Sequence, residues 1–307
     1  MVAANPRPPN PRPVSNRDID DLHAECLAWY EQHARDLPWR SDSAAPWHVM
    51  VSEFMLQQTP VVRVLPVYGQ WVRRWPHPAD LAAVASGEAV RAWGRLGYPR
   101  RALRLHACAV AIAGHHGGEV PSNLAELRAL PGVGDYTAAA IASFAFGQRH
   151  AVLDTNVRRV LGRVAHGEEY PSASVSVAER RLAKALLPTQ EHRAARWSVA
   201  VMELGALVCT AKSPSCGVCP IRRHCRWRLA GYPAYRGPTR RGQTYAGTDR
   251  QCRGRLLEVL RGVVEPVRKY RLDVVWDDAT QCERALDGLV ADGLVAVHVD
   301  GRYALPT

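Results

Sequence analysis

The stretch LRALPGVGDYTA, Leu127–Ala138, combines a helical segment, a sharp turn and the start of a second helix. Gly132 and Gly134 flank Val133, and glycine lets the backbone turn where other residues would be strained. The first N–H groups of a helix lack partners within the helix, and with the helix dipole they favour a bound phosphate. A turn of this kind therefore predicts a phosphate-binding site at the start of the second helix. The plain alternative is an ordinary connection between two helices.

Helical patterns dominate around this turn. Apolar residues recur at spacings of three and four from Ile19 to His33. Thr59-Pro60 is expected to cap a helix that Pro66 kinks or ends. Further helices are expected from residue 86 and at 101–114, 124–130, 136–146, 155–164 and about 191–208. Strand-like alternation is nearly absent before residue 290, so the main body is predicted to be all-α.

The two ends of the chain differ from this body. Residues 1–17 are rich in proline and arginine and hold no acid, which predicts a disordered basic tail. We expect the main domain over 18–230, a Gly-, Pro- and Thr-rich linker over 231–249 and a small domain over 250–307. Helices near 255–260 and 278–290 precede two short strands around Asp300-Gly301, a favoured two-residue hairpin turn. This order predicts a winged-helix-like α+β domain, although other small α+β arrangements share it.

The charge of the chain favours a polyanionic ligand. Forty Lys and Arg residues oppose 29 Asp and Glu, a net charge of +11 over 307 residues. Arginine suits phosphate, and a basic excess is typical of nucleic-acid binding. Seven arginines and no acid lie between residues 220 and 245. A genomic bias toward Arg and Ala is the alternative. Neither a membrane span nor an export signal is recognised, so a cytoplasmic, nucleoid-associated protein is expected.

A cluster of cysteines predicts a metal centre. Their spacing is C-x6-C-x2-C-x5-C, formed by Cys209, Cys216, Cys219 and Cys225. Without an export signal such a cluster indicates a metal site rather than disulfides. Four thiolates can hold a tetrahedral zinc or a [4Fe–4S] cluster, and the spacing is not that of a zinc ribbon. The remaining cysteines are expected to be plain buried thiols: Cys26, Cys108, Cys252 and Cys282.

Two carboxylates stand in contrasting surroundings. Glu53 is the sole formal charge in the apolar run PWHVMVSEFML (46–56), where burial would raise its pKa. Asp154 occupies an expected helix N-cap, and backbone N–H groups with Arg158 and Arg159 are expected to lower its pKa. One proton donor and one fixed anion suit hydrolysis through an oxocarbenium-like sugar. The alternatives are a Glu53 that faces water and an Asp154 that only caps its helix.

Six motifs and the cysteine loop follow one another along the chain: LPWR (37–40), SEFMLQQT (52–59), LGY (96–98), LPGVGDYTAAAI (130–141), LDTNVRRVL (153–161) and ELGALVC (203–209). This set resembles the adenine DNA glycosylases, the MutY family of the endonuclease III (HhH-GPD) superfamily, over about residues 20–228. The resemblance implies an all-α helix-hairpin-helix DNA glycosylase with a six-helix barrel module and a [4Fe–4S] module. Here a short, atypical C-terminal domain follows.

The family removes adenine mispaired with 8-oxoguanine or guanine, a base-excision repair step, after flipping the base out of the duplex. The resemblance implies that Glu53 protonates adenine N7 and later directs water. Asp154 stabilises the cationic sugar, and Tyr136 and Asn156 lie around these carboxylates. Bifunctional relatives carry a lysine at the position of Tyr136, so monofunctional excision is expected.

The resemblance also implies contacts with DNA and one cofactor. Arg40 lies near the flipped base, and the hairpin residues Pro131, Gly132, Val133 and Gly134 grip the backbone. The element that wedges the base stack and contacts 8-oxoguanine comprises Gln58, Thr59, Leu96 and Tyr98. The four clustered cysteines hold a single [4Fe–4S] cluster. Double-stranded DNA with A:8-oxoguanine or A:G mispairs is the expected partner, and a monomer is expected.

The sequence departs from the family pattern in three places. Ser198-Val199 replaces an Asn-Gln or Asn-Glu pair that reaches the flipped adenine. The C-terminal domain is too short for the usual 8-oxoguanine-recognition domain. LGYPRR replaces the commoner LGYYSR, where Arg100 and Arg101 either contact phosphate or only solvate a helix start. A glycosylase for thymine or another mismatch, and a non-catalytic Fe–S DNA-binding protein, are the competing interpretations.

Overall fold

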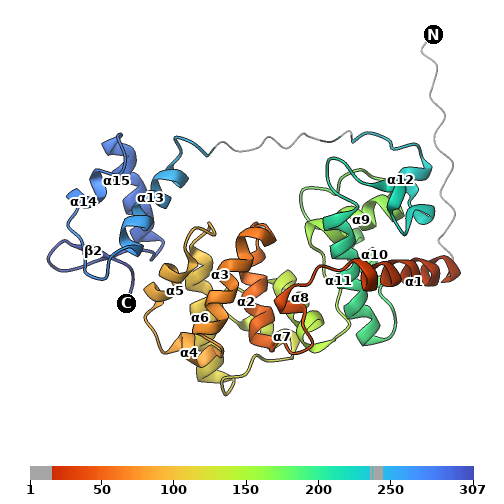
Figure 1. The fold of residues 1–307 in the computed structure, drawn as a ribbon, viewed down its shortest axis with the longest axis horizontal. Helices are drawn as coiled ribbons and strands as arrows, with labels where there is room; N and C mark the ends of the chain where they lie inside the picture. The colour runs from red at the N-terminus through yellow and green to blue at the C-terminus, as the bar shows by residue number, and fades with distance from the viewer. Residues whose placement is uncertain (1–15, 236, 238–244) are drawn as a thin grey trace, which may run out of the picture. The chain divides into compact units, whose positions relative to one another are not determined.

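The computed structural model describes residues 16–235, 237 and 245–307 (Figure 1). The expected tail over 1–17 and the centre of the expected linker therefore lie largely outside the described residues. The chain packs as two units. One combines the described residues before Asp36 with those from Gly147 to Tyr235, and the other combines Asp36–Phe146 with the chain from Gly237 onward. Among the described helices, none is both long and apolar enough to span a membrane.

The barrel of the second unit is entirely helical. Its elements are η1 (Pro38–Arg40), α2 (Pro46–Leu56), α3 (Val61–Arg74), α4 (Pro78–Ala82), α5 (Ser86–Trp93), α6 (Arg100–His115), α7 (Leu124–Ala129) and α8 (Asp135–Phe146). Helix α2 packs against α3, α6 and α8. Its side chains are apolar on nearly every face, as expected of a helix at the centre of a core. Phe54, Trp71 and Trp93 fill that core without exposure above 1%.

Pro66 does not end α3, so the prediction that the helix could end there is wrong. The helix continues to Arg74 although Pro66 has no N–H to donate to the carbonyl of Val62. Val62 is 76% exposed, and water can satisfy that carbonyl. The hydroxyl of Thr59 also does not cap the helix, because it donates to the carbonyl of Leu96 at 3.2 Å.

The C-terminal domain belongs to the same unit as the barrel. It consists of α13 (Asp249–Arg261), α14 (Tyr270–Asp273), α15 (Ala279–Ala291), β1 (Ala296–Val297) and β2 (Tyr303–Ala304). The strands are antiparallel and pair Ala296 with Ala304. The hairpin turn is centred on Val299-Asp300 rather than Asp300-Gly301, because the N–H of Gly301 donates to the carbonyl of His298. Gly301 follows with φ of +72°, the left-handed residue that a three-residue hairpin loop requires.

The first unit is also helical. It contains α1 (Asn16–His33), α9 (Thr155–Leu161), the π turn η2 (Gly162–His166), α10 (Val177–Ala185), α11 (Glu191–Leu207), η3 (Cys216–Val218), η4 (Arg222–His224) and α12 (Arg226–Leu229). Helix α11 packs on α1 and α9. The carboxylate of Glu203 is fully buried in α11 and binds the Arg35 guanidinium at 2.6 and 2.7 Å. This ion pair ties the chain directly after α1 to α11.

Candidate active site and metal centre

Glu53 is buried in the middle of α2, at 6% exposure, between apolar neighbours. The burial that the sequence predicts for it is confirmed, and the solvent-facing alternative is wrong. Tyr136 is half-buried on α8, the helix that packs against α2. Directly after α2, the Gln57 side-chain amide donates to the hydroxyl of Thr137 on α8 at 3.4 Å. Glu53 is therefore a buried carboxyl group on the helix that packs against the one carrying Tyr136.

Asp154 is the N-cap of α9 in the other unit. Its carboxylate accepts the backbone N–H of Val157 at 2.6 Å and the side-chain amide of Asn156 at 2.9 Å. Burial nevertheless raises the pKa of Asp154, because the cost of desolvating its charge exceeds the gain from these hydrogen bonds. The prediction of a lowered pKa is therefore wrong. The cap itself is confirmed.

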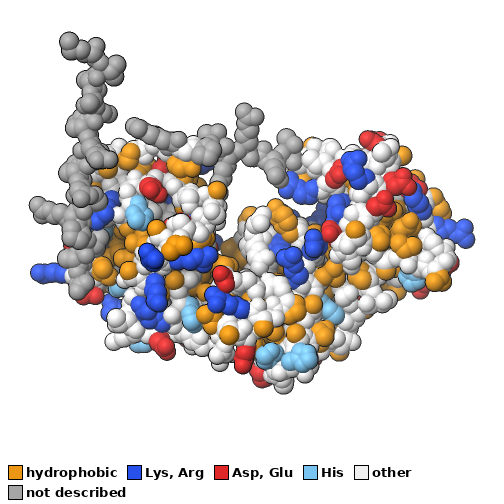
Figure 2. Space-filling model, turned by 180° about the vertical axis from the view of Figure 1, so that it is seen from behind, with side chains coloured by type: hydrophobic (Ala, Val, Ile, Leu, Met, Phe, Trp, Pro, Cys, Tyr) orange, Lys and Arg blue, Asp and Glu red, His pale blue; other side chains and the backbone are white. Residues whose placement is uncertain are grey.

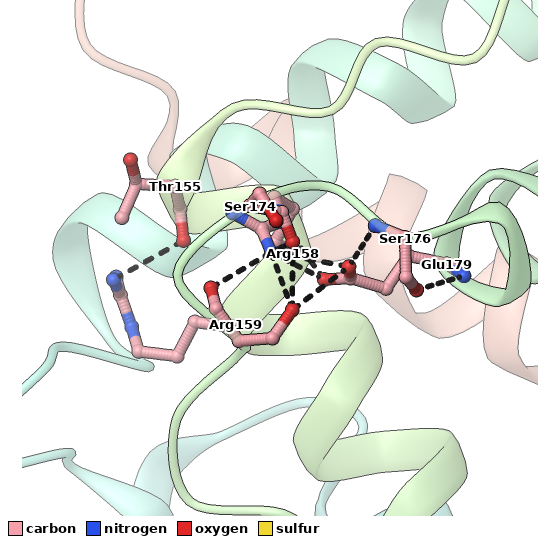
Figure 3. A network of polar contacts seen from close by, with 7 residues as sticks. Thr155, Arg158, Arg159, Ser174, Ser176 and Glu179 are labelled. Atoms are coloured by element: carbon pink, nitrogen blue, oxygen red, sulfur yellow. Dashed lines mark hydrogen bonds and ion pairs between the residues drawn. The ribbon is translucent and has the colours of Figure 1, made fainter. Parts of the chain in front are cut away.

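Of the two arginines expected beside Asp154, Arg159 acts on it as predicted, because its charge lowers the Asp154 pKa, whereas Arg158 is directed elsewhere. The Arg158 guanidinium binds Glu179 at 2.8 Å and the carbonyl of Ser174 at 2.9 Å (Figure 3). Glu179 is fixed in turn by a capping box with Ser176 at the start of α10. The charge of Arg158 thus ties α9 to α10. It does not face the Asp154 carboxylate.

Arg159 joins Asp154 to the cysteine loop indirectly. Its guanidinium donates to the Asn156 side-chain oxygen at 2.8 Å and to the carbonyl of Cys209 at 2.8 Å. It also donates to the carbonyl of Gly205 at 2.7 Å. A Cβ on Gly205 would lie 2.7 Å from Cβ of Asn156, so glycine is what lets α11 approach α9 this closely. A continuous series of hydrogen bonds therefore runs from the Asp154 carboxylate to the first clustered cysteine.

The four clustered cysteines line one cavity, together with apolar residues of α9, α11 and the loop itself. Burial, together with the smaller effect of the neighbouring thiols, raises the pKa of Cys219 to about 12, and thiolates held this close repel one another until a metal neutralises them. Among the described residues no three His, Cys, Asp or Glu side chains surround the position of a single metal ion. Four sulfur donors around a shared cavity fit a [4Fe–4S] cluster. The other four cysteines are buried thiols, as expected.

Arg163 connects this loop to the rest of the first unit. It is 1% exposed, and its guanidinium contacts Sγ of Cys209 at 3.2 Å. It also donates to the carbonyls of Thr210 and Ala211 at 2.8 and 3.1 Å and lies 4.5 Å from the ring of Trp227. Arg226, which directly follows the cysteine loop, makes a similar connection, since it donates to the carbonyl of Ala165 at 2.8 Å. Arg222 and Arg228 remain exposed.

The predicted wedge is built on two strained turns. Gln58 and Tyr98 have φ of +56° and +46°, a region that non-glycine residues rarely adopt. Both side chains are exposed, Tyr98 by 46%, whereas Thr59 and Leu96 are buried beneath them. Strain of this kind persists only where the surrounding structure enforces it.

Arg101 is the residue that holds both turns. Its guanidinium donates to the carbonyls of Phe54 and Met55 at 2.9 Å, and to those of Gln57 and Gly97. Burial lowers the pKa of Arg101 to about 10. Of the two arginines in LGYPRR, Arg101 is therefore a buried support, and only Arg100 is exposed.

The hairpin turn between α7 and α8 is confirmed as a tight connection. Gly132 has φ of +79°, and a Cβ there would lie 2.7 Å from Cβ of Arg104. Pro131, Gly132 and Gly134 are exposed, while Val133 is buried and anchors the turn. Arg40 is half-buried at the end of η1.

The atypical pair on α11 is not arranged as a polar contact. The Ser198 hydroxyl donates back to the carbonyl of Ala194 at 3.0 Å, and Val199 is half-buried. Sequence reasoning missed the buried roles of Arg101, Arg163 and Glu203. Arg163 and Glu203 stand in apolar runs, which is the local signal that could have indicated their burial, whereas Arg101 lies beside Arg100 and has no such signal.

The chain matches two protein-family models. Residues 51–186 match the model of the HhH-GPD superfamily base excision DNA repair protein. Residues 209–225 match the iron-sulfur binding domain of endonuclease III. The chain therefore carries an iron–sulfur cofactor domain, which the cysteine spacing predicted.

The chain is also similar to known adenine DNA glycosylases and to solved DNA glycosylase structures. Adenine DNA glycosylase of Mycobacterium tuberculosis (strain H37Rv) is 53% identical over 97% of each chain. The human adenine DNA glycosylase is 42% identical over 69% of this chain and 41% of its own. The structure of a thermostable thymine-DNA glycosylase covers 71% of this chain and all of its own, with a TM-score of 0.63 and 26% identity. An endonuclease III–DNA complex, 23% identical with a TM-score of 0.60, shares the fold. The buried Glu53, the capped Asp154, the tight hairpin and the cysteine loop thus stand in a chain that belongs to the adenine DNA glycosylase family.

Proposed function

We propose that this protein is a monofunctional adenine DNA glycosylase, which acts as a monomer on adenine opposite 8-oxoguanine or guanine in duplex DNA. The observation that carries the proposal is the 53% identity to adenine DNA glycosylase of M. tuberculosis over 97% of both chains. The buried Glu53 and the N-cap Asp154 supply the chemistry that such an enzyme requires.

Two carboxyl groups perform the reaction in this proposal. Glu53 gives a proton to N7 of the flipped adenine, so that the base leaves as a neutral molecule when its bond to C1′ breaks. The sugar is left with a positive charge shared between C1′ and the ring oxygen. Asp154, fixed by Val157 and Asn156, places a negative charge beside this cation. Glu53 then takes a proton from the water that attacks C1′, and the products are free adenine and an abasic site.

Strand cleavage is not expected to follow. A lyase step requires an amine that forms a Schiff base with the sugar. The sequence has Tyr136 in the hairpin helix and no lysine before Lys184. The iron–sulfur cluster, when bound by the four cysteines, holds the loop 209–225 in shape. The hairpin, Gln58 and Tyr98 contact the DNA.

Single-turnover base release on matched duplexes tests this proposal. The duplexes carry A opposite 8-oxoguanine, A opposite G, and T opposite G, and each is analysed with and without alkali. We expect loss of adenine alone, with strand breaks only after alkali. Release of thymine would favour a thymine glycosylase, consistent with the absence of an amide at Ser198-Val199. Breaks without alkali would contradict the monofunctional mechanism.

A conservative variant separates an enzyme from a binding module. Glu53→Gln keeps the size of the side chain but removes the proton donor. The enzyme should lose base release by at least about 100-fold, the typical worth of general acid catalysis, while it still binds the mispaired duplex. A glycosylase rate equal to that of the parent would exclude Glu53 as the acid.

A further inference from the structure

A groove of about 1040 Å³ lies between the C-terminal domain and the barrel, within one packed unit. On the barrel side its walls come from the α5–α6 turn and the start of α6, including Arg95, Arg100 and Arg104. On the other side they come from α13, including Arg250 and Arg255. Figure 2 shows several Lys and Arg side chains around the junction of these two parts.

The C-terminal domain is docked on the barrel by specific contacts. The Arg91 guanidinium donates to carbonyls at the C-terminal end of α13, among them that of Val263 at 2.8 Å. Arg261 donates in the opposite direction to the carbonyl of Val90 at 3.0 Å. The N–H of Gly87 donates to the carbonyl of Pro306 at 2.7 Å. Because these contacts hold α13 against the barrel, the groove is a fixed feature of this unit.

The charge of the groove is strongly positive. Nine arginines and two acids line it, a net charge of +7. Both acids already have partners, since Glu258 pairs with Arg95, and Asp292 pairs with Arg100 and Arg253. The remaining arginines concentrate positive potential in a concave surface, which attracts a polyanion.

The groove is continuous with the features already predicted to contact DNA. The exposed side chains of Gln58 and Tyr98 stand on its wall. Arg104, which also lines it, packs directly against Gly132 of the hairpin. A polyanion that lies along the hairpin and the wedge would therefore reach α13 as well.

Near its centre, helix α13 has a glycine where it lines the groove. Gly254 lines the groove, and a Cβ there would contact only Tyr245 Oη at 3.4 Å. Space inside the protein thus does not demand glycine at this position, and glycine lowers helix stability by about 1 kcal/mol relative to alanine. Glycine is expected where a ligand approaches the backbone closely.

We propose that this groove extends the DNA-binding surface, so that the phosphodiester backbone of the substrate duplex lies between α13 and the α5–α6 turn. The short C-terminal domain thereby forms one wall of the DNA-binding surface. This inference rests on the proposed function, because the same duplex is the ligand.

Salt-dependent binding of a fluorescent mispaired duplex tests the groove directly. The test variant is the double substitution Arg250→Gln and Arg255→Gln, two exposed residues of α13. The matched control is Arg268→Gln and Arg271→Gln, which removes the same charge from exposed positions of the same domain outside the groove. We expect the groove variant to bind about tenfold more weakly at 150 mM KCl, with a salt slope lower by about 1 to 2, because each lost phosphate contact lowers it by about 0.9. The control should stay within about twofold of the parent.

A second pair of variants separates charge from folding. Gly254→Glu places an anion in the groove, and Gly254→Gln places a neutral side chain of the same size there. The Glu variant should bind DNA several-fold more weakly than the Gln variant, with equal thermal stability. Unchanged binding in the groove variants, or an equal loss in the Arg268/Arg271 control, overturns the proposal. Adenine release by the parent protein is read in parallel, so failure of the glycosylase assay with intact groove binding would reject only the proposed function.

Discussion

Buried arginines carry much of the organisation at the scale of single residues. Arg101 holds the two turns of the wedge, Arg159 joins Asn156 to the cysteine loop, and Arg163 contacts a clustered sulfur. Each donates mainly to backbone carbonyls from distant segments, a role for which the planar, five-donor guanidinium is better suited than lysine. Their positions could not be predicted from spacing, because the carbonyls they bind are brought together only by the fold.

Arg163→Gln is expected to weaken the iron–sulfur centre. The substitution removes a positive charge beside Cys209 Sγ, where it would offset the negative charge of bound thiolates. Purified protein should hold at most about half of the iron of the parent, measured as iron per chain and as the visible absorbance of the cluster. Arg222→Gln, on the exposed surface of the same loop, is the control. An equal loss in both variants would show that Arg163 has no particular role.

His23 makes the stability of the first unit sensitive to pH. Burial lowers the pKa of His23, whose ring nitrogen bonds the carbonyl of Leu186 at 2.7 Å. Below the unfolded pKa of about 6.5 the unfolded chain binds a proton that the folded state resists, so stability present above that pH is lost on acidification. The melting temperature should fall from pH 7 to 5.5 in the parent, and less steeply in His23→Gln. His115→Gln, at an exposed position, should retain the slope of the parent.

At the scale of elements, the hairpin between α7 and α8 and the cysteine loop were predictable because their chemistry is local. A glycine with positive φ and four cysteines at fixed spacing determine their structures within a few residues. The pKa of Asp154 was not predictable in this way. Its direction depends on the burial of Asp154 in the fold, which outweighs the hydrogen bonds from Val157 and Asn156 and the charge of Arg159.

The hairpin supplies its own control. Gly132→Ala places a methyl group 2.7 Å from Arg104 Cβ at φ of +79°, whereas a Cβ on Gly134 would meet nothing within 4 Å. We expect Gly132→Ala to cost about 1–2 kcal/mol from the left-handed backbone alone and to weaken DNA binding several-fold. Gly134→Ala should change the melting temperature little. Comparable losses of stability in the two variants would contradict this account of the turn.

At the scale of the whole molecule, helix content and the C-terminal strand pair followed from periodicity, but the docking of the C-terminal domain did not. That contact depends on Arg91, Gly87 and the last residues of the chain, which no local pattern connects. The interface also places α13 beside the wedge, so the domain's arrangement matters for function. The stability of this docked arrangement can be tested without altering any residue of the groove.

Gly87→Ala is expected to loosen the C-terminal domain. A Cβ at Gly87 would lie 2.4 Å from the carbonyl oxygen of Pro306, and backbone on both sides leaves little freedom to adjust. The chain end must shift, so the hydrogen bond between the Gly87 N–H and Pro306 is lost and the Arg91 contacts weaken. Limited proteolysis should then release the C-terminal domain several-fold faster than in the parent. Gly114→Ala is the matched control, since a Cβ there meets nothing within 4 Å. If the groove binds DNA, Gly87→Ala should also reduce the salt slope of binding although it removes no charge. Faster proteolysis with unchanged DNA binding would mean that the docked arrangement is structural and that α13 does not contact the duplex.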